Sequence, residues 1–307
     1  MTVAVYAATR DYTDAIRQNN PKRRVSVSGI LHYLGVSTSG YYAWTKHIPS
    51  ASENHRKQMK NKIQDVYQRS YQIYGAPKIT AVLRRQGNTI SERTTGKYMH
   101  EMGIRALWVK HWTHTTIHSD FDLQLKNILN EQFNPANPNQ VWVSDITYIW
   151  TDEGFVYLTS VMDLFSRRIL AWTLSTTLEA KYVVETVQKA IRERSGAKPR
   201  VFHNDRGCQY VAQEFLNATR GMINSYSKKG YPWDNACIES FHSLIKREWL
   251  RRFKIRNYEE AYRYVFEYIN TFYNTIRVHS HCGYLSPDQY ERKYLDRMEK
   301  SRQQMAG

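Results

Sequence analysis

The fold of this chain is decided by residues 141–175, which read VWVSDITYIWTDEGFVYLTSVMDLFSRRILAWTLS. The stretch is rich in β-branched and aromatic residues, and short polar connections divide it into three apolar runs. Apolar runs of this length with short connections predict an antiparallel meander of three strands.

The residues after the meander alternate between helix and strand patterns. The expected elements are a helix over 178–196, a strand over 199–205, a helix over 211–219, a strand over 222–227, and helices over 234–253 and 258–276. A meander followed by this alternation predicts an α/β fold, in which a mixed sheet carries helices on its faces.

The residues before the meander have helical patterns and no strand pattern. We expect five parts: an N-terminal helical part (1–52), a helix-turn-helix DNA-binding domain (53–110), a connector (111–138), a catalytic core (139–256) and a C-terminal helical extension (257–307). In the second part, Ser91 can cap a helix that Gly103 closes, and this helix would present Arg93, Thr95 and Lys97 to a DNA groove. A plain three-helix bundle is the alternative there, and in residues 1–52 a small helical hairpin is as well supported as a second helix-turn-helix.

The charge of the chain favours a polyanionic partner. Among 307 residues the formal net charge is +16, with 18 Lys and Arg against 6 Asp and Glu in residues 1–110. Lysine and arginine that pair with phosphates release counterions, which drives association with nucleic acid. A generic basic protein, or one that binds an anionic membrane, is the alternative on charge alone.

The cysteines and histidines do not suggest a structural metal site or disulfides. Cys208, Cys237 and Cys282 are odd in number and lack metal-ligand spacing, so a reducing cytoplasm is expected. His111 and its two neighbouring histidines lack a cysteine or acid at ligand spacing, which argues against zinc. The mean hydropathy is −0.65, and no apolar run is long enough to cross a membrane, so we expect a soluble protein.

Three carboxylates occupy positions that need an explanation. Asp145 lies within the first predicted strand, Asp205 at the carboxyl end of a later strand, and Glu239 on a predicted helix that has Asn235, His242 and Lys246 on the same face. By contrast, Asp163 reads as a hairpin residue and Asp234 as a helix N-cap.

Carboxylates gathered at one edge of a sheet would raise each other's pKa unless cations lay among them. Oxygen ligands without a cysteine or histidine set select Mg²⁺ or Mn²⁺ over zinc. Two such ions support in-line phosphoryl displacement, so we expect phosphodiester chemistry on DNA.

Five motifs in order resemble the integrase-like transposases of bacterial insertion sequences of the IS-three group. These motifs are WVSDITYI, VMDLFSRRILAW, HNDRGCQY, SKKGYPWDNACIESFHSLIKREW and YNTIRVHSHCGYLSPDQY. The upstream segment YQIYGAPKITAVLRRQGNTISERTTGKYMHEMGI resembles the helix-turn-helix module of the same family. The resemblance covers residues 54–291, and the chain looks like the second-frame catalytic protein of such an element.

The resemblance implies a ribonuclease-H-like fold, with a mixed five-stranded sheet, and an Asp-Asp-Glu triad at Asp145, Asp205 and Glu239. It implies that Lys246 contacts transposon-end DNA, and we add Asn235, Arg206 and His203 as further residues that could orient phosphates. The expected enzyme is a DDE transposase, a polynucleotidyl transferase with two Mg²⁺ or Mn²⁺ ions. It would cut the 3′ ends of terminal inverted repeats and transfer the strands. The first product would be a circular intermediate, which then integrates into target DNA.

The expected partners are double-stranded DNA, a second copy of the chain, because two DNA ends must be held together, and the upstream-frame protein. The chain departs from the family pattern in one respect: 33 residues lie between Asp205 and Glu239, slightly fewer than usual, which bears on the geometry of Glu239. A non-catalytic DNA-binding regulator, or a nuclease of the same fold, is the alternative function.

Overall fold

The computed structural model describes residues 2–20, 24–107, 125–228 and 231–306. It divides into two compact units, residues 1–62 and 63–307, and each is considered by itself. None of the helices in the described ranges is both long and apolar enough to cross a membrane.

The N-terminal unit is helical and has a small aromatic core. Its first three helices are α1 (Thr2–Asn19), α2 (Val27–Tyr33) and α3 (Thr38–Thr45). The buried side chains of Tyr6, Leu31 and Tyr41 pack together between them. The Tyr6 hydroxyl donates a hydrogen bond to the carbonyl of Ser37 at 3.0 Å and passes so close to Gly40 that a Cβ there would lie 2.5 Å away. The short helices α2 and α3 are therefore held against α1 by this tyrosine.

Three helices follow, α4 (Ala51–Arg69), which crosses the boundary between the units, α5 (Ala76–Arg85) and α6 (Glu92–Glu101). The Ser91 side chain accepts a hydrogen bond from the amide of Thr94, and Gly103 has a φ of +69° just after the helix. The predicted cap and stop of the third helix are both confirmed.

The larger unit is built on one five-stranded sheet with the order β3-β2-β1-β4-β5. The strands are β1 (Val141–Thr151), β2 (Gly154–Asp163), β3 (Ile169–Ser175), β4 (Val201–Asn204) and β5 (Ile223–Tyr226). The first three pair antiparallel, and β4 and β5 add parallel to β1. This is the mixed sheet predicted from the meander and the alternation that follows it.

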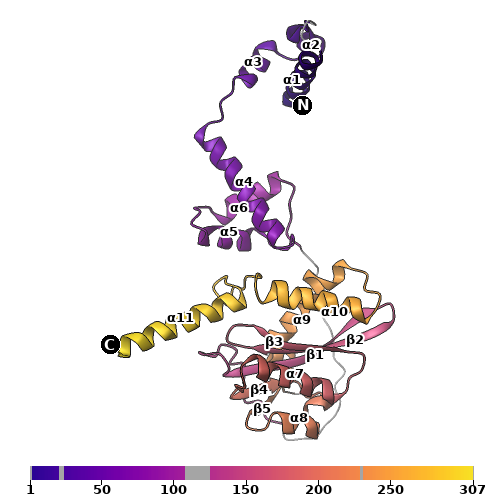
Figure 1. Ribbon diagram of the computed structural model, residues 1–307, viewed down its shortest axis with the longest axis vertical. Coiled ribbons are helices and arrows are strands. Elements are labelled where there is room, and N and C mark those ends of the chain that lie inside the picture. The colour runs from indigo at the N-terminus through magenta and orange to yellow at the C-terminus, as the bar shows by residue number, and fades with distance from the viewer. Residues whose placement is uncertain (1, 21–23, 108–124, 229–230, 307) are drawn as a thin grey trace. The chain divides into compact units, whose positions relative to one another are not determined.

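Helices cover both faces of the sheet (Figure 1). On one face, α7 (Ala180–Glu193) packs Val183 and Val187 into a core with Trp142 and Phe202, and α8 (Gln213–Ala218) adds Phe215. On the other face, α9 (Ala236–Glu248) and α10 (Tyr258–Phe266) contact β1. The fold is therefore a ribonuclease-H-like α/β core, as expected.

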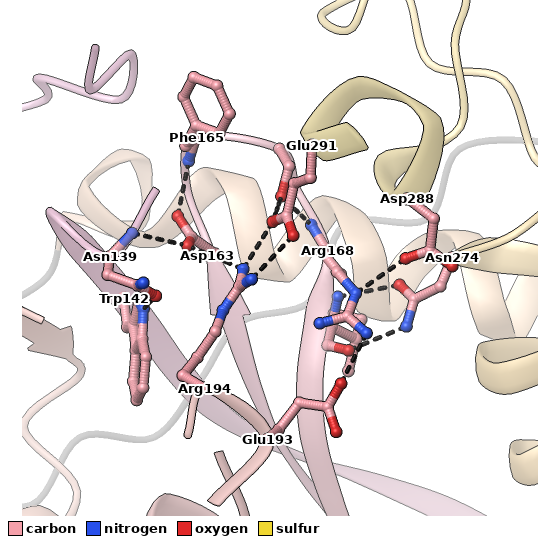
Figure 2. Close-up of polar contacts among 12 residues, drawn as sticks. Asn139, Trp142, Asp163, Phe165, Arg168, Glu193, Arg194, Asn274, Asp288 and Glu291 are labelled. Atoms are coloured by element: carbon pink, nitrogen blue, oxygen red, sulfur yellow. Dashed lines mark hydrogen bonds and ion pairs between the residues drawn. The ribbon is translucent and has the colours of Figure 1, made fainter. Parts of the chain in front are cut away.

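The C-terminal extension continues from α10 through a π-helical stretch, η4 (Glu267–Tyr273), to α11 (Pro287–Ala306). Figure 2 shows how it is fastened to the core: Arg194, just after α7, lies between the carboxylates of Asp163, 3.1 Å away, and Glu291, 2.8 Å away. Arg168 similarly bridges Asp288 and Glu193 at 2.8 and 2.7 Å. The extension is thus part of the same packed unit as the sheet.

Of the two acids that the sequence sets apart from the triad, one keeps its predicted role and one does not. Asp163 ends β2 at the turn to β3, as predicted for a hairpin residue, and its carboxylate accepts a hydrogen bond from the amide of Phe165 in that turn. It is also fully buried and accepts a hydrogen bond from the amide of Asn139, so it anchors the fold as well. Asp234 does not cap α9; its carboxylate accepts a hydrogen bond from the amide of Lys228 at 2.6 Å. Both carboxylates are thus satisfied by backbone amides.

Candidate active site

Asp145 lies on β1, two residues beyond the last pair between β1 and β4. The parallel register joins Val143 to His203, so Asp145 and Asp205 leave the paired region at the same level. The Asp145 Oδ2 atom lies 3.3 Å from Nδ1 of His242, which α9 brings to this face of the sheet. The other carboxylate oxygen accepts a hydrogen bond from the amide of Ile146.

Asp205 follows β4 directly, at the carboxyl end of a parallel strand, where the backbone turns away from the sheet. Its Oδ1 atom accepts a hydrogen bond from the amide of Gly207 at 2.9 Å. Burial, and then the negative charge of Asp145, raise the pKa of Asp205 to about 7. Asp145 is therefore close enough to disfavour the ionised form of Asp205.

Glu239 lies in the first turn of α9. Although the residue is exposed, partial withdrawal of its carboxyl from water, followed by the charges of Asp145 and Asp205, raises the pKa of Glu239 to about 7. The shorter interval after Asp205 therefore still brings the third carboxylate within electrostatic reach of the other two.

The charges of the three acids fit a divalent cation, since a cation would remove the repulsion that contributes to the raised pKa values of Asp205 and Glu239. Their present side-chain positions do not form a ligand cage: within the described ranges, no group of three or more His, Cys, Asp or Glu side chains is arranged to hold a metal ion. Asp145 faces His242 and Asp205 faces the amide of Gly207 instead. The donor chemistry suits Mg²⁺, while the ligands would have to turn towards it.

Lys246 lies two turns after Glu239 on α9 and stands at the margin of the same site. Its Nζ atom lies 4.3 Å from the centre of the Tyr148 ring. Burial lowers the pKa of Lys246 to about 8, with Asp145 acting in the opposite direction. A cation held so close to the carboxylates can accept a phosphate group.

The remaining core residues named from the sequence support the fold. His203 is fully buried between the hydroxyls of Ser225 and Ser227, at 2.9 and 3.2 Å, and burial lowers the pKa of His203 to about 4. The side chain has no exposed surface to offer a phosphate in this structure, and its DNA contact stays a prediction. Asn235 is also buried, with its amide 3.5 Å from the carbonyl of Ser144, so it has no surface to offer a phosphate in this structure.

Arg206 is half-buried beside Asp205 and donates hydrogen bonds to two carbonyls, those of Ser227 and Leu125. It therefore ties the segment before the core to the end of β5, next to the second aspartate. This contact supports the site, and a DNA contact by Arg206 stays a prediction.

On α6, Arg93 and Lys97 are exposed, as a DNA-reading helix requires. Thr95 is fully buried, and its hydroxyl receives a hydrogen bond from the Thr80 hydroxyl at 2.8 Å. Thr95 is thus not one of the exposed residues of this helix, because it shares a face with buried Met99 one turn later.

His242 is a site residue that the sequence does not identify. It shares the polar face of its helix with Glu239 and Lys246, but no local pattern indicates that it faces Asp145. That relation depends on the packing of α9 across β1, which places its ring 3.3 Å from the carboxylate.

Comparisons with known proteins agree with this architecture. Residues 135–232 and 220–287 match two models of an integrase core domain, and residues 53–112 match an HTH-like domain.

The chain is 33% identical over 274 residues to "Transposase InsF for insertion sequence IS3A" of Escherichia coli (strain K12), covering 88% of this chain and 95% of that protein. It is 35% identical over 246 residues to "Transposase for insertion sequence element IS904" of Lactococcus lactis, covering 80% and 97%. Among solved structures, the HTLV-2 integrase catalytic core domain in complex with magnesium is similar, with 17% identity, a TM-score of 0.40 and coverage of 51% of this chain and 98% of that one.

The sheet, its helices and the two integrase core matches define a member of the polynucleotidyl transferase superfamily that carries an HTH-like domain. More narrowly, the chain belongs to the IS3 family of insertion-sequence transposases.

Proposed function

We propose that this transposase binds the terminal inverted repeats of its element, cuts the 3′ ends and transfers them to a second phosphodiester, with Asp145, Asp205 and Glu239 as its catalytic carboxylates. The observation that carries the proposal is the parallel register of β1 and β4, which brings Asp145 and Asp205 to the same end of the sheet, where α9 contacts β1 and carries Glu239. The charges of both aspartates raise the pKa of Glu239, in keeping with that arrangement.

The three carboxylates would hold Mg²⁺ or Mn²⁺, as two ions, which when bound supply a more acidic attacking oxygen and stabilise the leaving oxygen of an in-line displacement. The chain's own residues would position the rest. His242 holds the carboxylate of Asp145, and Lys246 places a positive charge beside the site where a phosphate would lie. Arg206 fixes the backbone next to Asp205 through its two carbonyl contacts.

The proposed reaction has two displacements at phosphorus. In the first, a water oxygen bonds to phosphorus and the bond to the terminal O3′ breaks; the water loses a proton to solvent and the departing O3′ gains one. In the second, the oxygen of the freed 3′-hydroxyl bonds to the phosphorus of another phosphodiester, and the bond from that phosphorus to its own O3′ breaks. The attacking hydroxyl loses a proton to solvent and the departing O3′ gains one. One phosphodiester replaces another, so no external energy source is needed. If the first target is the other end of the element, the product is a circular intermediate that later integrates.

DNA ends would be recognised by the HTH-like domain, with Arg93 and Lys97 of α6 directed at the duplex. Their exposure and the net charge of +16 support this role. Because two ends must be held together, we propose that a dimer or larger assembly acts, together with the upstream-frame protein, in the bacterial cytoplasm at the nucleoid.

The deciding experiment is strand joining on DNA that carries the ends of the element, with and without Mg²⁺. We expect joined product from the natural chain and none from Asp205→Ala. Asp296→Ala removes an exposed carboxylate from α11 and is the matched control, which should join normally.

The two alternatives give different outcomes in the same assay. A non-catalytic regulator would bind the ends and neither cut nor join them, and a nuclease would cut without joining. Unchanged joining by Asp205→Ala would remove this residue from the mechanism.

A further inference from the structure

Three exposed aromatic side chains are gathered on the outer half of the β1–β2 hairpin. Trp150 and Phe155 are directly opposite each other across the strands, with ring centres 4.8 Å apart and planes at 76°. Phe155 also meets Tyr148 edge-on, with ring centres 5.2 Å apart. Trp150 is 63% exposed, Phe155 47% and Tyr148 44%. The three rings form one continuous aromatic surface, which we call the hairpin patch.

The hairpin patch lies on the face of the sheet that α7 covers farther along the same strands. Two residues on that face, Ile146 and Val161, pack in the core against Val183 and Val187 of α7. The opposite face of the hairpin is buried, as Ile149 and Val156 show. Large aromatic side chains left together in water, next to a face that is otherwise covered, mark a surface for a ligand.

The hairpin patch lies close to the candidate active site along β1 but on the other face of the sheet, because Tyr148 shares the α7 face while Asp145 points to the face that α9 covers. Tyr148 follows Asp145 by three residues on β1, about 10 Å along an extended strand, or about three stacked nucleotides. In the described residues, β1 pairs with β4 only over Val141–Val143, so Lys246 can reach past the outer half of β1 and place its ammonium over the Tyr148 ring. One cation therefore connects the carboxylates with the aromatic surface.

A strongly basic segment runs along the tip of the same hairpin. Residues 246–256 read KREWLRRFKIR, with six Lys and Arg and one Glu, and that Glu is paired internally with Arg277. The amide of Asp152 at the hairpin turn donates a hydrogen bond to the carbonyl of Ile255, and Lys254 lies 3.2 Å from the Asp152 carboxylate. The side chains of Arg251, Arg252, Lys254 and Arg256 are exposed.

The hairpin patch and the basic segment 246–256 together indicate which kind of ligand binds here. The cations favour a polyanion, and the exposed rings favour planar groups that can stack on them. A nucleic acid strand offers both, but a fully paired duplex hides the faces of its bases in its own stack. A second copy of this chain would bring the same cations against one another, which opposes a symmetric contact here.

We propose that Tyr148, Trp150 and Phe155 form a stacking platform for unpaired bases of a DNA strand whose backbone runs along residues 246–256. The proposal deepens the proposed function and rests on it, since it places separated bases of a DNA end on the same strand, β1, as Asp145, across the outer edge of the sheet from the phosphate to be cut. The platform binds bases through their faces, so it does not select a base sequence.

The test measures binding by the full chain without metal ions, so that no strand is cut. The probes are a duplex with a short single-stranded extension containing 2-aminopurine, and a fully paired duplex of the same length. We expect binding to the extended probe to quench the 2-aminopurine fluorescence. The double variant Trp150→Ala/Phe155→Ala should lose the quenching. It should bind the extended probe at least about tenfold more weakly, which is the loss expected for one stacked base. Its affinity for the paired duplex should stay unchanged.

Two control variants separate stacking from misfolding. Phe266→Ala removes an aromatic side chain of nearly equal exposure, 45%, from α10 and should change neither affinity nor quenching. Trp150→Tyr keeps a stacking ring and should preserve most of the binding.

Three results would overturn the platform. The double variant could lose affinity equally for both probes, or lose affinity for neither. It could also change its oligomeric state in sedimentation without DNA, which would assign the patch to a second copy.

The outcome is separable from that of the proposed function. A chain that quenches 2-aminopurine but never joins strands keeps the platform and loses the transposase mechanism, and one that joins strands without quenching does the reverse.

Discussion

The carboxylate of Glu248, at the last turn of α9, is held by two hydrogen bonds from the guanidinium of Arg277, at 2.6 and 2.7 Å. Both side chains are buried, and the Tyr268 hydroxyl donates a third hydrogen bond to Glu248 at 2.8 Å. Glu248 belongs to the helix that carries Glu239 and Lys246, whereas Arg277 belongs to the C-terminal extension. The extension therefore fixes the end of the candidate catalytic helix.

Removal of Arg277 should destabilise the fold more than removal of the whole pair. Arg277→Met leaves a buried carboxylate without its cation, which costs about 3–5 kcal/mol of unfolding free energy. The double variant Glu248→Leu/Arg277→Met removes both charges and should recover most of that loss. Urea denaturation of the single and double variants measures both values, and a double variant less stable than Arg277→Met would contradict this account of the pair.

Asp205→Asn should stabilise the metal-free chain above neutral pH. The folded-state pKa of Asp205, about 7, lies above its ordinary value of 3.8, because of burial and the charge of Asp145. As the pH rises from about 4 to about 7, the unfolded chain releases this proton first, so the stability of the metal-free fold decreases across that window and stays reduced above it. The amide in Asp205→Asn should restore at least about 1 kcal/mol at pH 8.

The same variant should respond less to Mg²⁺. Binding of a cation among the carboxylates stabilises the folded chain in proportion to its affinity, so Mg²⁺ should raise the unfolding midpoint of the natural chain at pH 8 and raise that of Asp205→Asn much less. Asp296→Asn, on exposed α11, is the control. Equal Mg²⁺ shifts in the natural chain and in Asp205→Asn would show that this carboxylate does not bind the cation.

The meander and the helices around it could be predicted because their patterns are local. The residue-by-residue pairing of the strands could not be predicted. The alternation of side chains in VWVSDITYIW, however, places Asp145 and Tyr148 on opposite faces of the first strand. Asp145, Asp205 and Glu239 could be named because each stands at a distinctive place in a motif.

What could not be predicted depends on contacts between segments far apart in the chain. Asp163 looked like a turn residue, and only the approach of Arg194 and Glu291 explains its complete burial (Figure 2). His203 looked like part of the active-site motif, yet its direction was set by the hydroxyls of Ser225 and Ser227 on the neighbouring strand. A periodic pattern gives the face of an element, but not what will pack against it.

DNA binding through Lys246 should depend on pH. Burial lowers the pKa of this ammonium from 10.5 to about 8, so its charge is present below that value and is lost as the pH rises through it. The affinity of the natural chain for DNA should therefore decrease between about pH 7 and pH 9, whereas Lys246→Arg, which stays charged, should show a flatter profile. Fluorescence anisotropy at constant ionic strength measures this, with Lys198→Arg, an exposed lysine before β4, as the control. Identical profiles for the natural chain and Lys246→Arg would exclude Lys246 as the titrating contact.

Neighbouring positions of α6 should separate DNA binding from stability. Arg93 and Lys97 are exposed, so Arg93→Ala and Lys97→Ala should each weaken DNA binding and reduce the slope of log affinity against log salt by about 1, with little effect on unfolding. Thr95→Val removes the acceptor of the buried Thr80 hydroxyl, so it should cost about 1–3 kcal/mol of unfolding free energy while the salt slope stays unchanged. Salt titrations of binding and urea denaturation, carried out on all three variants, distinguish the two classes. If Thr95→Val lowered the salt slope, or if Arg93→Ala lowered stability as much as Thr95→Val does, α6 would not present the face that its burial pattern indicates.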